Sequence, residues 1–93
     1  MTRPTALIIG SGVAGLATAI RLAAKGYAVQ VFEAADAPGG KLAELQLGPY
    51  RFDRGPSLFT RPDLVEELFQ VAGVSMTGRF SYHKLEEANR YFW

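Results

Sequence analysis

Residues 5–33, TALIIGSGVAGLATAIRLAAKGYAVQVFE, decide the fold of this chain. The first segment, Thr5–Ile9, is a short apolar run between a proline and a glycine, which predicts a buried strand. Over residues 13–24 the apolar positions recur at helical spacing, and Gly26 follows as a stop signal. Tyr27–Phe32 carries β-branched and aromatic residues, which favour a second strand. The stretch therefore predicts a strand–helix–strand unit with parallel strands, the start of an α/β fold.

Three glycines stand at the turn into the helix, in the pattern Gly10-x-Gly12-x-x-Gly15. The first permits a tight turn, the second lets the backbone approach a pyrophosphate, and the third lets the helix pack close to the strand. The helix N-terminus adds N–H groups and a positive dipole end, which favour phosphate. Glu33 ends the second strand, where a carboxylate can accept hydrogen bonds from ribose hydroxyls. These features predict dinucleotide binding, and an acid that repels a 2′-phosphate favours NAD or FAD over NADP.

The same apolar stretch also resembles a secretory signal peptide. Residues 6–20 carry no charge, follow Arg3, and contain an A-x-A pattern at Ala17–Ala19. The run is shorter than the roughly 20 residues that a membrane-spanning helix needs. Glycines also interrupt it at spacings that a hydrophobic signal core has no reason to keep. We therefore reject both the signal peptide and the membrane span.

The composition excludes several classes of protein. The 93 residues are 48% hydrophobic and 20% charged, which is a globular composition and not a disordered one. A net charge of +1 is unlike the basic stripe of a nucleic-acid binder, so no nucleic-acid partner is expected. The absence of cysteine excludes disulfides, cysteine-based zinc sites and thiol nucleophiles. We predict no metal site, and the single histidine, His83, is interpreted as a packing or surface residue.

The remainder of the chain predicts a hairpin followed by an amphipathic helix. Leu42–Leu47 and Tyr50–Asp53 are short strand candidates joined by a Gly-Pro turn. Thr60 is the expected N-cap of a helix with an apolar face over residues 62–72. Two further strands are predicted, over Phe80–Lys84 and Arg90–Trp93.

Four motifs, in order, resemble the glutathione-reductase-type FAD proteins of the amine oxidase and carotenoid desaturase superfamily. The glycine pattern extends to a small residue, Ala19, as FAD-type fingerprints do. Glu33 is followed by Gly-Gly-Lys at 39–41, and residues 52–60, FDRGPSLFT, resemble the FDxGPS/T stretch of phytoene desaturases. The pattern Tyr82-x-x-Leu85 and the segment Arg90–Trp93 are also similar to the N-terminal third of that family. The chain thus resembles the FAD-dependent phytoene desaturase and carotenoid desaturase-isomerase family.

The resemblance implies FAD as the cofactor and assigns residues to its parts. The loop residues around the pyrophosphate would be Gly10, Ser11, Gly12, Val13, Ala14 and Gly15. Glu33 would hold the adenosine ribose, with Ala34 beside it. Gly39, Gly40 and Lys41 would line the path from the pyrophosphate to the ribityl chain, where a lysine makes a single-point contact. Gly55, Pro56 and Ser57 would approach the flavin ring. The competing interpretation of Gly39-Gly40 is a simple flexible turn.

The resemblance also implies an activity for the complete protein. In that family the flavin accepts a hydride equivalent from a polyene hydrocarbon, so we expect an oxidoreductase that desaturates or isomerises a carotenoid such as phytoene. The catalytic residues are unknown and would lie in later sequence. The expected location is cytoplasmic, with peripheral membrane contact through that later sequence. A doubly wound domain needs two βαβαβ halves, so residues 1–93 are expected to be the N-terminal portion of a two-dinucleotide-fold FAD-binding domain that is incomplete at its C-terminus.

Three alternatives stay open. An amine oxidase of the same superfamily would share the first two motifs, although GPSLFT favours the desaturase branch. Rab escort and GDP-dissociation-inhibitor relatives keep the fold and bind prenylated proteins without flavin, but their third motif glycine is typically replaced, whereas Gly15 is intact here. The last alternative is that the fragment by itself is inert because later residues complete the FAD site.

Overall fold

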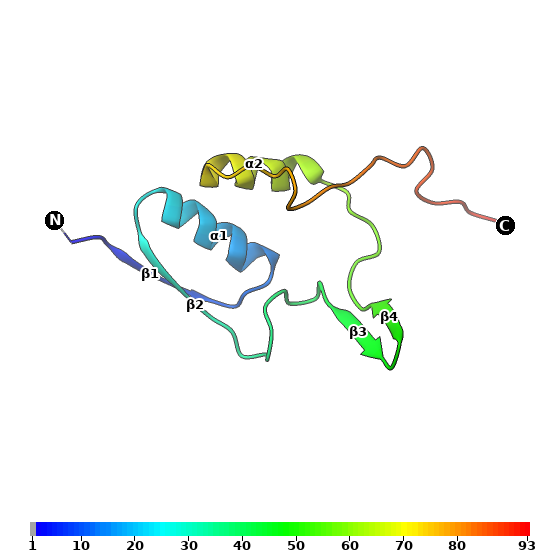
Figure 1. Ribbon diagram of the computed structural model, residues 1–93, viewed down its shortest axis with the longest axis horizontal. Coiled ribbons are helices and arrows are strands. Elements are labelled where there is room, and N and C mark those ends of the chain that lie inside the picture. The colour runs from blue at the N-terminus through cyan, green and yellow to red at the C-terminus, as the bar shows by residue number, and fades with distance from the viewer. Residues whose placement is uncertain (1) are drawn as a thin grey trace.

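The computed structural model describes residues 2–93 and begins with the predicted strand–helix–strand unit (Figure 1). Strand β1 (Thr5–Ile9) leads into helix α1 (Val13–Ala24), which returns the chain to strand β2 (Ala28–Phe32). The two strands pair in parallel, from Thr5 opposite Ala28 to Ile9 opposite Phe32. The predicted α/β fold with a parallel pair is therefore confirmed.

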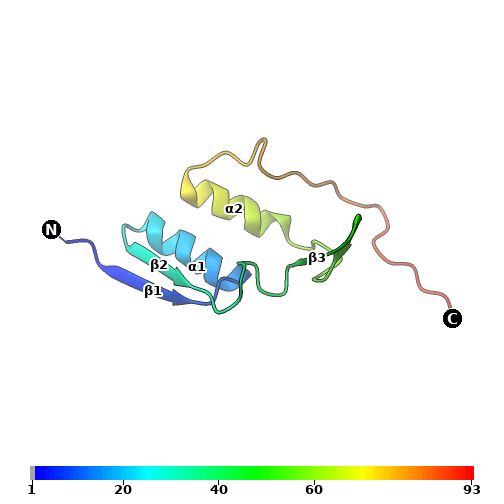
Figure 2. The same cartoon turned by 60° about the horizontal axis from the view of Figure 1, so that its bottom comes forward.

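Helix α2 (Pro62–Ala72) lies beside α1, on the side away from the strands (Figures 1 and 2). Helix α1 is thus the middle of three layers, with β1 and β2 below it and α2 above. An exposed ion pair joins the two helices, with 3.0 Å between Nη2 of Arg21 and Oε1 of Glu67. Exposed pairs of this kind add little stability.

The start of α2 differs in detail from its prediction. The N-cap is Arg61 and not the predicted Thr60, and the Arg61 side chain donates two hydrogen bonds to the carboxylate of Asp63 in the first turn. Helix α2 ends at Gly73, directly after the predicted range of 62–72, and the φ of 68° at Gly73 is the left-handed conformation that glycine adopts easily.

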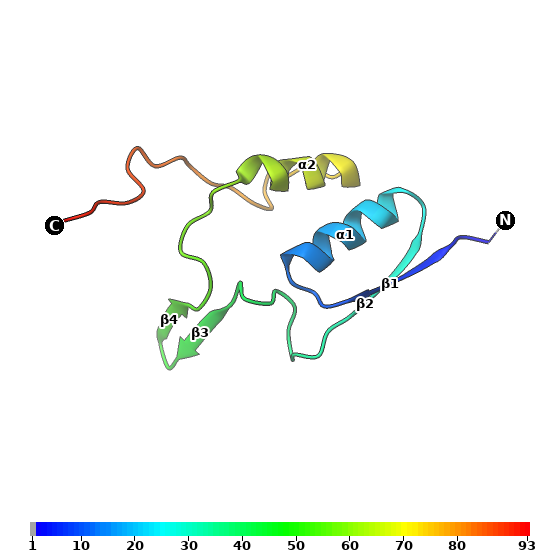
Figure 3. The same cartoon turned by 180° about the vertical axis from the view of Figure 1, so that it is seen from behind.

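The predicted hairpin is present and projects away from the parallel pair (Figures 1 and 3). Strand β3 (Glu44–Leu47) pairs antiparallel with β4 (Tyr50–Asp53). The first strand begins at Glu44 rather than at the predicted Leu42. The reason is local, since the N–H of Leu42 donates to the carbonyl of Gly39 and this bond closes a turn.

The two predicted C-terminal strands, Phe80–Lys84 and Arg90–Trp93, are wrong. Both segments are irregular in the structure. A strand needs a neighbour for its backbone N–H and C=O groups, and the described chain offers these segments none. Their aromatic residues pack locally instead: Phe80 and Tyr82 contact Phe59, and the rings of Tyr91 and Trp93 stack with centroids 5.9 Å apart.

No hydrophobic side chain among residues 2–93 is fully buried. The chain exposes 8183 Å², whereas a folded monomer of its mass is expected to expose about 5,300 Å². Its radius of gyration is 16.7 Å, against about 12 Å for a compact domain of this length. The described residues therefore hold a layered scaffold without a closed core.

One face of the parallel pair is uncovered. The side chain of Ile8 faces α1, because its Cγ2 atom lies 3.5 Å from the position of a Cβ on Gly15. Successive side chains alternate across a strand, so Leu7 and Ile9 point to the other face, where they are 62% and 89% exposed. Parallel sheets are normally covered on both faces. Neither described helix has the length and hydropathy that crossing a membrane would take.

Candidate functional site

The glycine loop joins the end of β1 to the start of α1, and two of its glycines are required by the loop itself. Gly10 has a φ of +99°, and its N–H donates to the carbonyl of Phe32 at 2.7 Å, which ties the loop to β2. A Cβ on Gly15 would lie 2.0 Å from the Gly10 carbonyl oxygen. The first turn of α1 therefore rests directly on the loop, a spacing that only glycine permits.

Gly12 is different, because the protein itself does not require a glycine there. Its φ is −73°, and a Cβ at this position would meet no protein atom within 4 Å. Gly12 is the N-cap of α1, with no side-chain capping bond and no acidic residue in the first turn. The predicted residues Val13 and Ala14 begin this turn, so their backbone N–H groups and the positive helix end face an open space suited to an anion.

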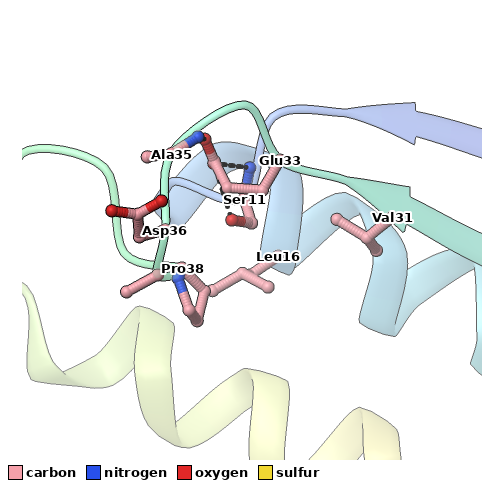
Figure 4. A pocket seen from close by; sticks show the side chains of 8 residues that line it. Ser11, Leu16, Val31, Glu33, Ala35, Asp36 and Pro38 are labelled. Atoms are coloured by element: carbon pink, nitrogen blue, oxygen red, sulfur yellow. Dashed lines mark hydrogen bonds between the residues drawn. The ribbon is translucent and has the colours of Figure 1, made fainter.

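Glu33 follows β2 and turns its carboxylate to Ser11 in the glycine loop (Figure 4). Oε1 of Glu33 accepts the Ser11 N–H at 2.9 Å and the Ser11 hydroxyl at 2.7 Å, while Oε2 accepts the Ala35 N–H at 2.9 Å. The N–H of Ala35, followed by the hydroxyl and N–H of Ser11, lowers the pKa of Glu33 to about 2. The carboxylate is therefore ionised and oriented at neutral pH.

The role of Ser11 departs from its expected one. The resemblance placed its N–H on a pyrophosphate, but in the structure that N–H is bound to Glu33. The N–H of Ser11 is therefore occupied by the carboxylate of Glu33, unlike the role that the resemblance implied. Ala35, which contributes the other hydrogen bond, was missed by sequence reasoning. In the sequence, only the position of Ala35, two residues after Glu33, could have indicated this hydrogen bond.

A hollow of about 270 Å³ lies beside this carboxylate (Figure 4). Its lining is apolar apart from Ser11, Glu33 and Asp36. The lining residues are Ser11, Leu16, Val31, Glu33, Ala35, Asp36, Ala37 and Pro38. An apolar wall with a few convergent polar groups is typical of a site for a small-molecule ligand or cofactor. None of residues 35–38 was predicted as a site residue, whereas Ala34, which was predicted, does not line the hollow.

The predicted segments meet in a row beside the glycine loop. The N–H of Gly39 donates to the Ser11 carbonyl at 2.8 Å. Gly40, at a φ of +62°, approaches the loop so closely that a Cβ on it would lie 3.1 Å from the Gly12 α-carbon. A Cβ on Gly55 would in turn lie 2.3 Å from the carbonyl oxygen of Lys41. Segments 10–15, 39–41 and 55–56 are therefore neighbours in space.

A second hollow, of about 480 Å³, lies at the far end of this row. It is lined by Gly40, Lys41, Ala43, Arg54, Gly55 and Pro56. Four of these were predicted, whereas Ser57 is not in the lining. Arg54 was missed, although it occupies the variable position of the FDxGPS pattern, and its N–H donates to the Ala43 carbonyl at 2.8 Å. With Lys41 it gives this hollow two cationic side chains.

The two hollows carry opposite charge. Glu33 and Asp36 line the first, and Lys41 and Arg54 line the second, with the contact between Gly12 and Gly40 between them. Among residues 2–93 no group of His, Asp and Glu side chains is arranged to hold a metal ion. The arrangement suits an extended ligand of three parts. A neutral, hydroxylated end would lie at the acidic hollow, an anionic group in the middle, and a negatively charged or electron-rich end at the basic hollow.

Residues 8–72, which include the glycine loop, Glu33 and both hollows, match the family described as the NAD(P)-binding Rossmann-like domain. The chain belongs to this family. The Rossmann-like chain is also 56% identical over 88 residues to a 1-hydroxycarotenoid 3,4-desaturase from Flavobacterium sp. (strain P99-3), covering 95% of this chain and 18% of that protein.

Two further relatives are similar in the same region. A phytoene dehydrogenase from Streptomyces griseus is 42% identical over 84 residues, covering 90% of this chain and 17% of the relative. A 4,4'-diapolycopene oxygenase from Methylomonas sp is 40% identical over 87 residues, covering 94% and 18%. This Rossmann-like chain therefore spans less than a fifth of the length of these relatives.

Proposed function

We propose that this chain is the dinucleotide-binding start of an FAD-dependent oxidoreductase that desaturates or isomerises a carotenoid such as phytoene. The observation that carries the proposal is the row of contacts from Ser11 to Gly39, Gly12 to Gly40 and Lys41 to Gly55. These contacts run from the first hollow, which contains Glu33, past the N-terminus of α1 to the second hollow, which contains Lys41 and Arg54. The relatives, named a carotenoid desaturase and a phytoene dehydrogenase, support the choice of a polyene substrate.

The residues fit FAD in three parts. An oxygen of Glu33 would accept a ribose hydroxyl at the first hollow. The N–H groups of Val13 and Ala14, next to the open space at Gly12, would face the pyrophosphate. At the second hollow, the cationic side chains of Lys41 and Arg54 would attract the negative charge of the pyrophosphate and the electron-rich flavin half of the cofactor. When bound, the flavin supplies the acceptor for the hydride equivalent that leaves the polyene.

The choice of FAD over NADP rests on charge. The ionised Glu33 carboxylate beside Asp36 would repel a 2′-phosphate on the ribose. The family description names NAD(P), so NAD is the competing cofactor. NAD and FAD both continue past the pyrophosphate, so the choice of FAD rests on the FAD-type glycine pattern that extends to Ala19 and on the relatives named a carotenoid desaturase and a phytoene dehydrogenase.

Residues 1–93 are, in this proposal, the N-terminal portion of a larger two-dinucleotide-fold domain. The 8183 Å² of exposed surface and the uncovered face bearing Leu7 and Ile9 support it, because these surfaces need further strands and helices to bury them. The catalytic residues and the walls of the substrate channel would come from that further sequence. A long apolar substrate would bring the complete protein to the membrane surface.

The test uses the complete protein with phytoene or a 1-hydroxycarotenoid in phosphatidylcholine vesicles. We expect a yellow protein that releases one FAD on denaturation and forms products with additional C=C bonds. Gly12→Val should purify without flavin, and Ala19→Ser is the matched control that should remain yellow. A folded protein that binds NAD and no flavin would overturn the FAD assignment.

The other outcomes separate the alternatives. Bound flavin with hydrogen peroxide release from primary amines, and no carotenoid turnover, would identify an amine oxidase. Products that gain oxygen would place the protein with the diapolycopene oxygenase relative. A protein that binds no dinucleotide but retains a prenylated peptide would identify a non-catalytic relative.

A further inference from the structure

Ser11 is the most enclosed residue of the described chain. It is 3% exposed, and among residues 2–93 no other residue is buried. All of its polar groups have partners: the N–H and the hydroxyl donate to Oε1 of Glu33, and the carbonyl accepts the Gly39 N–H. The sequence predicted only a pyrophosphate contact for this residue and assigned no role to its side chain. These hydrogen bonds connect the glycine loop to Glu33, at the end of β2, and to Gly39, in the segment that follows it.

These bonds decide which oxygen of Glu33 remains available. A carboxylate accepts about four hydrogen bonds, roughly two on each oxygen. Oε1 already accepts two from Ser11, whereas Oε2 accepts one, from Ala35, and the N–H of Ala34 makes only the smallest contribution to lowering the pKa of Glu33. The remaining acceptor position therefore lies on Oε2, beside the apolar hollow that contains Leu16 and Pro38.

We propose that Ser11 is a positioning residue: its hydroxyl holds Glu33 so that Oε2 presents one acceptor to a ribose hydroxyl of the cofactor. This inference rests on the proposed dinucleotide function. It assigns the serine to the carboxylate, not to the pyrophosphate, and it makes the second residue of the glycine motif part of ribose recognition. Ser11 acts through Glu33 and needs no contact with the ligand.

The hydroxyl also has an electrostatic effect. Its hydrogen bond is one of the causes that hold the pKa of Glu33 at about 2, after the larger contribution of the Ala35 N–H. The other charged group that lines the hollow is Asp36, from the segment after β2, while α1 and β2 contribute only Leu16 and Val31. Without the hydroxyl, Glu33 would be easier to protonate and would be held by two backbone hydrogen bonds instead of three bonds in all, with the charge of Asp36 still nearby.

The experiment is a double-mutant cycle in the complete protein, with ADP as the probe. Binding of ADP to the flavin-free protein is measured by calorimetry for the wild type, Ser11→Ala, Glu33→Gln and the double variant. We expect Ser11→Ala to weaken ADP about 3- to 10-fold at pH 7. In the Glu33→Gln background the same change should cost less than about 2-fold, because the hydroxyl then has no carboxylate to orient.

Two further measurements keep the positioning role separate from a loss of folding. Carbon-13 NMR of the Glu33 carboxyl should show a higher pKa in Ser11→Ala than in the wild type, and ADP affinity in that variant should begin to fall at a higher pH. An equal loss in both backgrounds, or an unchanged Glu33 pKa, would overturn the positioning role alone. ADP binding that is unaffected by Glu33→Gln would instead overturn the ribose assignment of the proposed function.

Discussion

The α-carbon of Gly15 lies against the carbonyl oxygen of Gly10, so closely that a Cβ on Gly15 would be 2.0 Å from that oxygen. This contact brings the first turn of α1 onto the loop that precedes it. A Cβ on Gly12, three residues earlier, would meet no protein atom within 4 Å. Two glycines of one motif are therefore required for different reasons, one by the protein and one, in our proposal, by the ligand.

The first prediction separates these reasons by stability. Gly15→Ala should destabilise the protein by about 1–3 kcal/mol, because the added methyl group must push the helix away from the Gly10 carbonyl. Gly12→Ala should change stability by less than about 1 kcal/mol, since its φ is ordinary and its Cβ meets no protein atom. Urea unfolding of the two flavin-free variants measures the difference. Equal destabilisation would contradict the close contact between Gly15 and Gly10.

The second prediction concerns flavin retention by the same loop. Gly12→Val should fold and yet lose FAD, because its side chain would fill the space that faces the N–H groups of Val13 and Ala14. The absorbance of flavin near 450 nm, relative to protein, is the measurement, on the order of one FAD per chain in the wild type. A Val variant that purifies with its full FAD content would exclude the loop as the pyrophosphate site.

The third prediction concerns Glu33. Replacement by alanine removes the carboxylate that would accept a ribose hydroxyl, and FAD affinity should fall roughly 10- to 150-fold. Glu44→Ala, in the exposed hairpin, is a matched loss of one carboxylate away from the site and should leave affinity unchanged. Fluorescence titration of the flavin-free protein compares them. Equal affinities for the wild type and Glu33→Ala would remove the ribose assignment.

The fourth prediction is the pH dependence of folding. The pKa of Glu33 is lowered from its ordinary value of 4.5 to about 2 in the folded chain, so the unfolded state binds the proton more readily. The stabilisation from this group is complete above pH about 4.5 and disappears as the pH falls through about 2. Glu33→Gln should flatten this part of the stability profile, measured by urea unfolding between pH 2 and pH 6. A wild-type profile identical to that of the variant would contradict the ionised, hydrogen-bonded carboxylate.

The fifth prediction concerns residues 1–93 expressed alone. The uncovered face with Leu7 and Ile9, and the outer edges of the two strands, should drive self-association, and binding of FAD should be weak or absent. Leu7→Lys should reduce association in sedimentation velocity, whereas Gln46→Lys, which adds the same charge on the hairpin, should not. A stable monomer with one bound FAD would make these residues a self-sufficient flavin module.

Local patterns in the sequence determined most of the architecture and much of the candidate site. The spacing of apolar residues in 5–32 and the glycines at its turn are short-range signals, so the parallel pair, α1 and the position of Glu33 could be predicted from them. The hairpin and α2 followed in the same way from turn and stop residues. Phe80–Lys84 and Arg90–Trp93 were mispredicted because a strand exists only where another strand can pair with it, which local composition does not report.

Only the tertiary structure decided what the site residues do to one another. Ser11 and Glu33 are far apart in the chain, and the hydrogen bonds between them exist because β1 and β2 run in parallel and end side by side. Lys41 also lies against Gly55 and shares one hollow with Arg54. Both relationships depend on how two irregular segments fold back on the glycine loop. Periodicity identifies helices and strands because it follows from local geometry; contacts between loops depend on the path of the whole chain, and no local pattern encodes them.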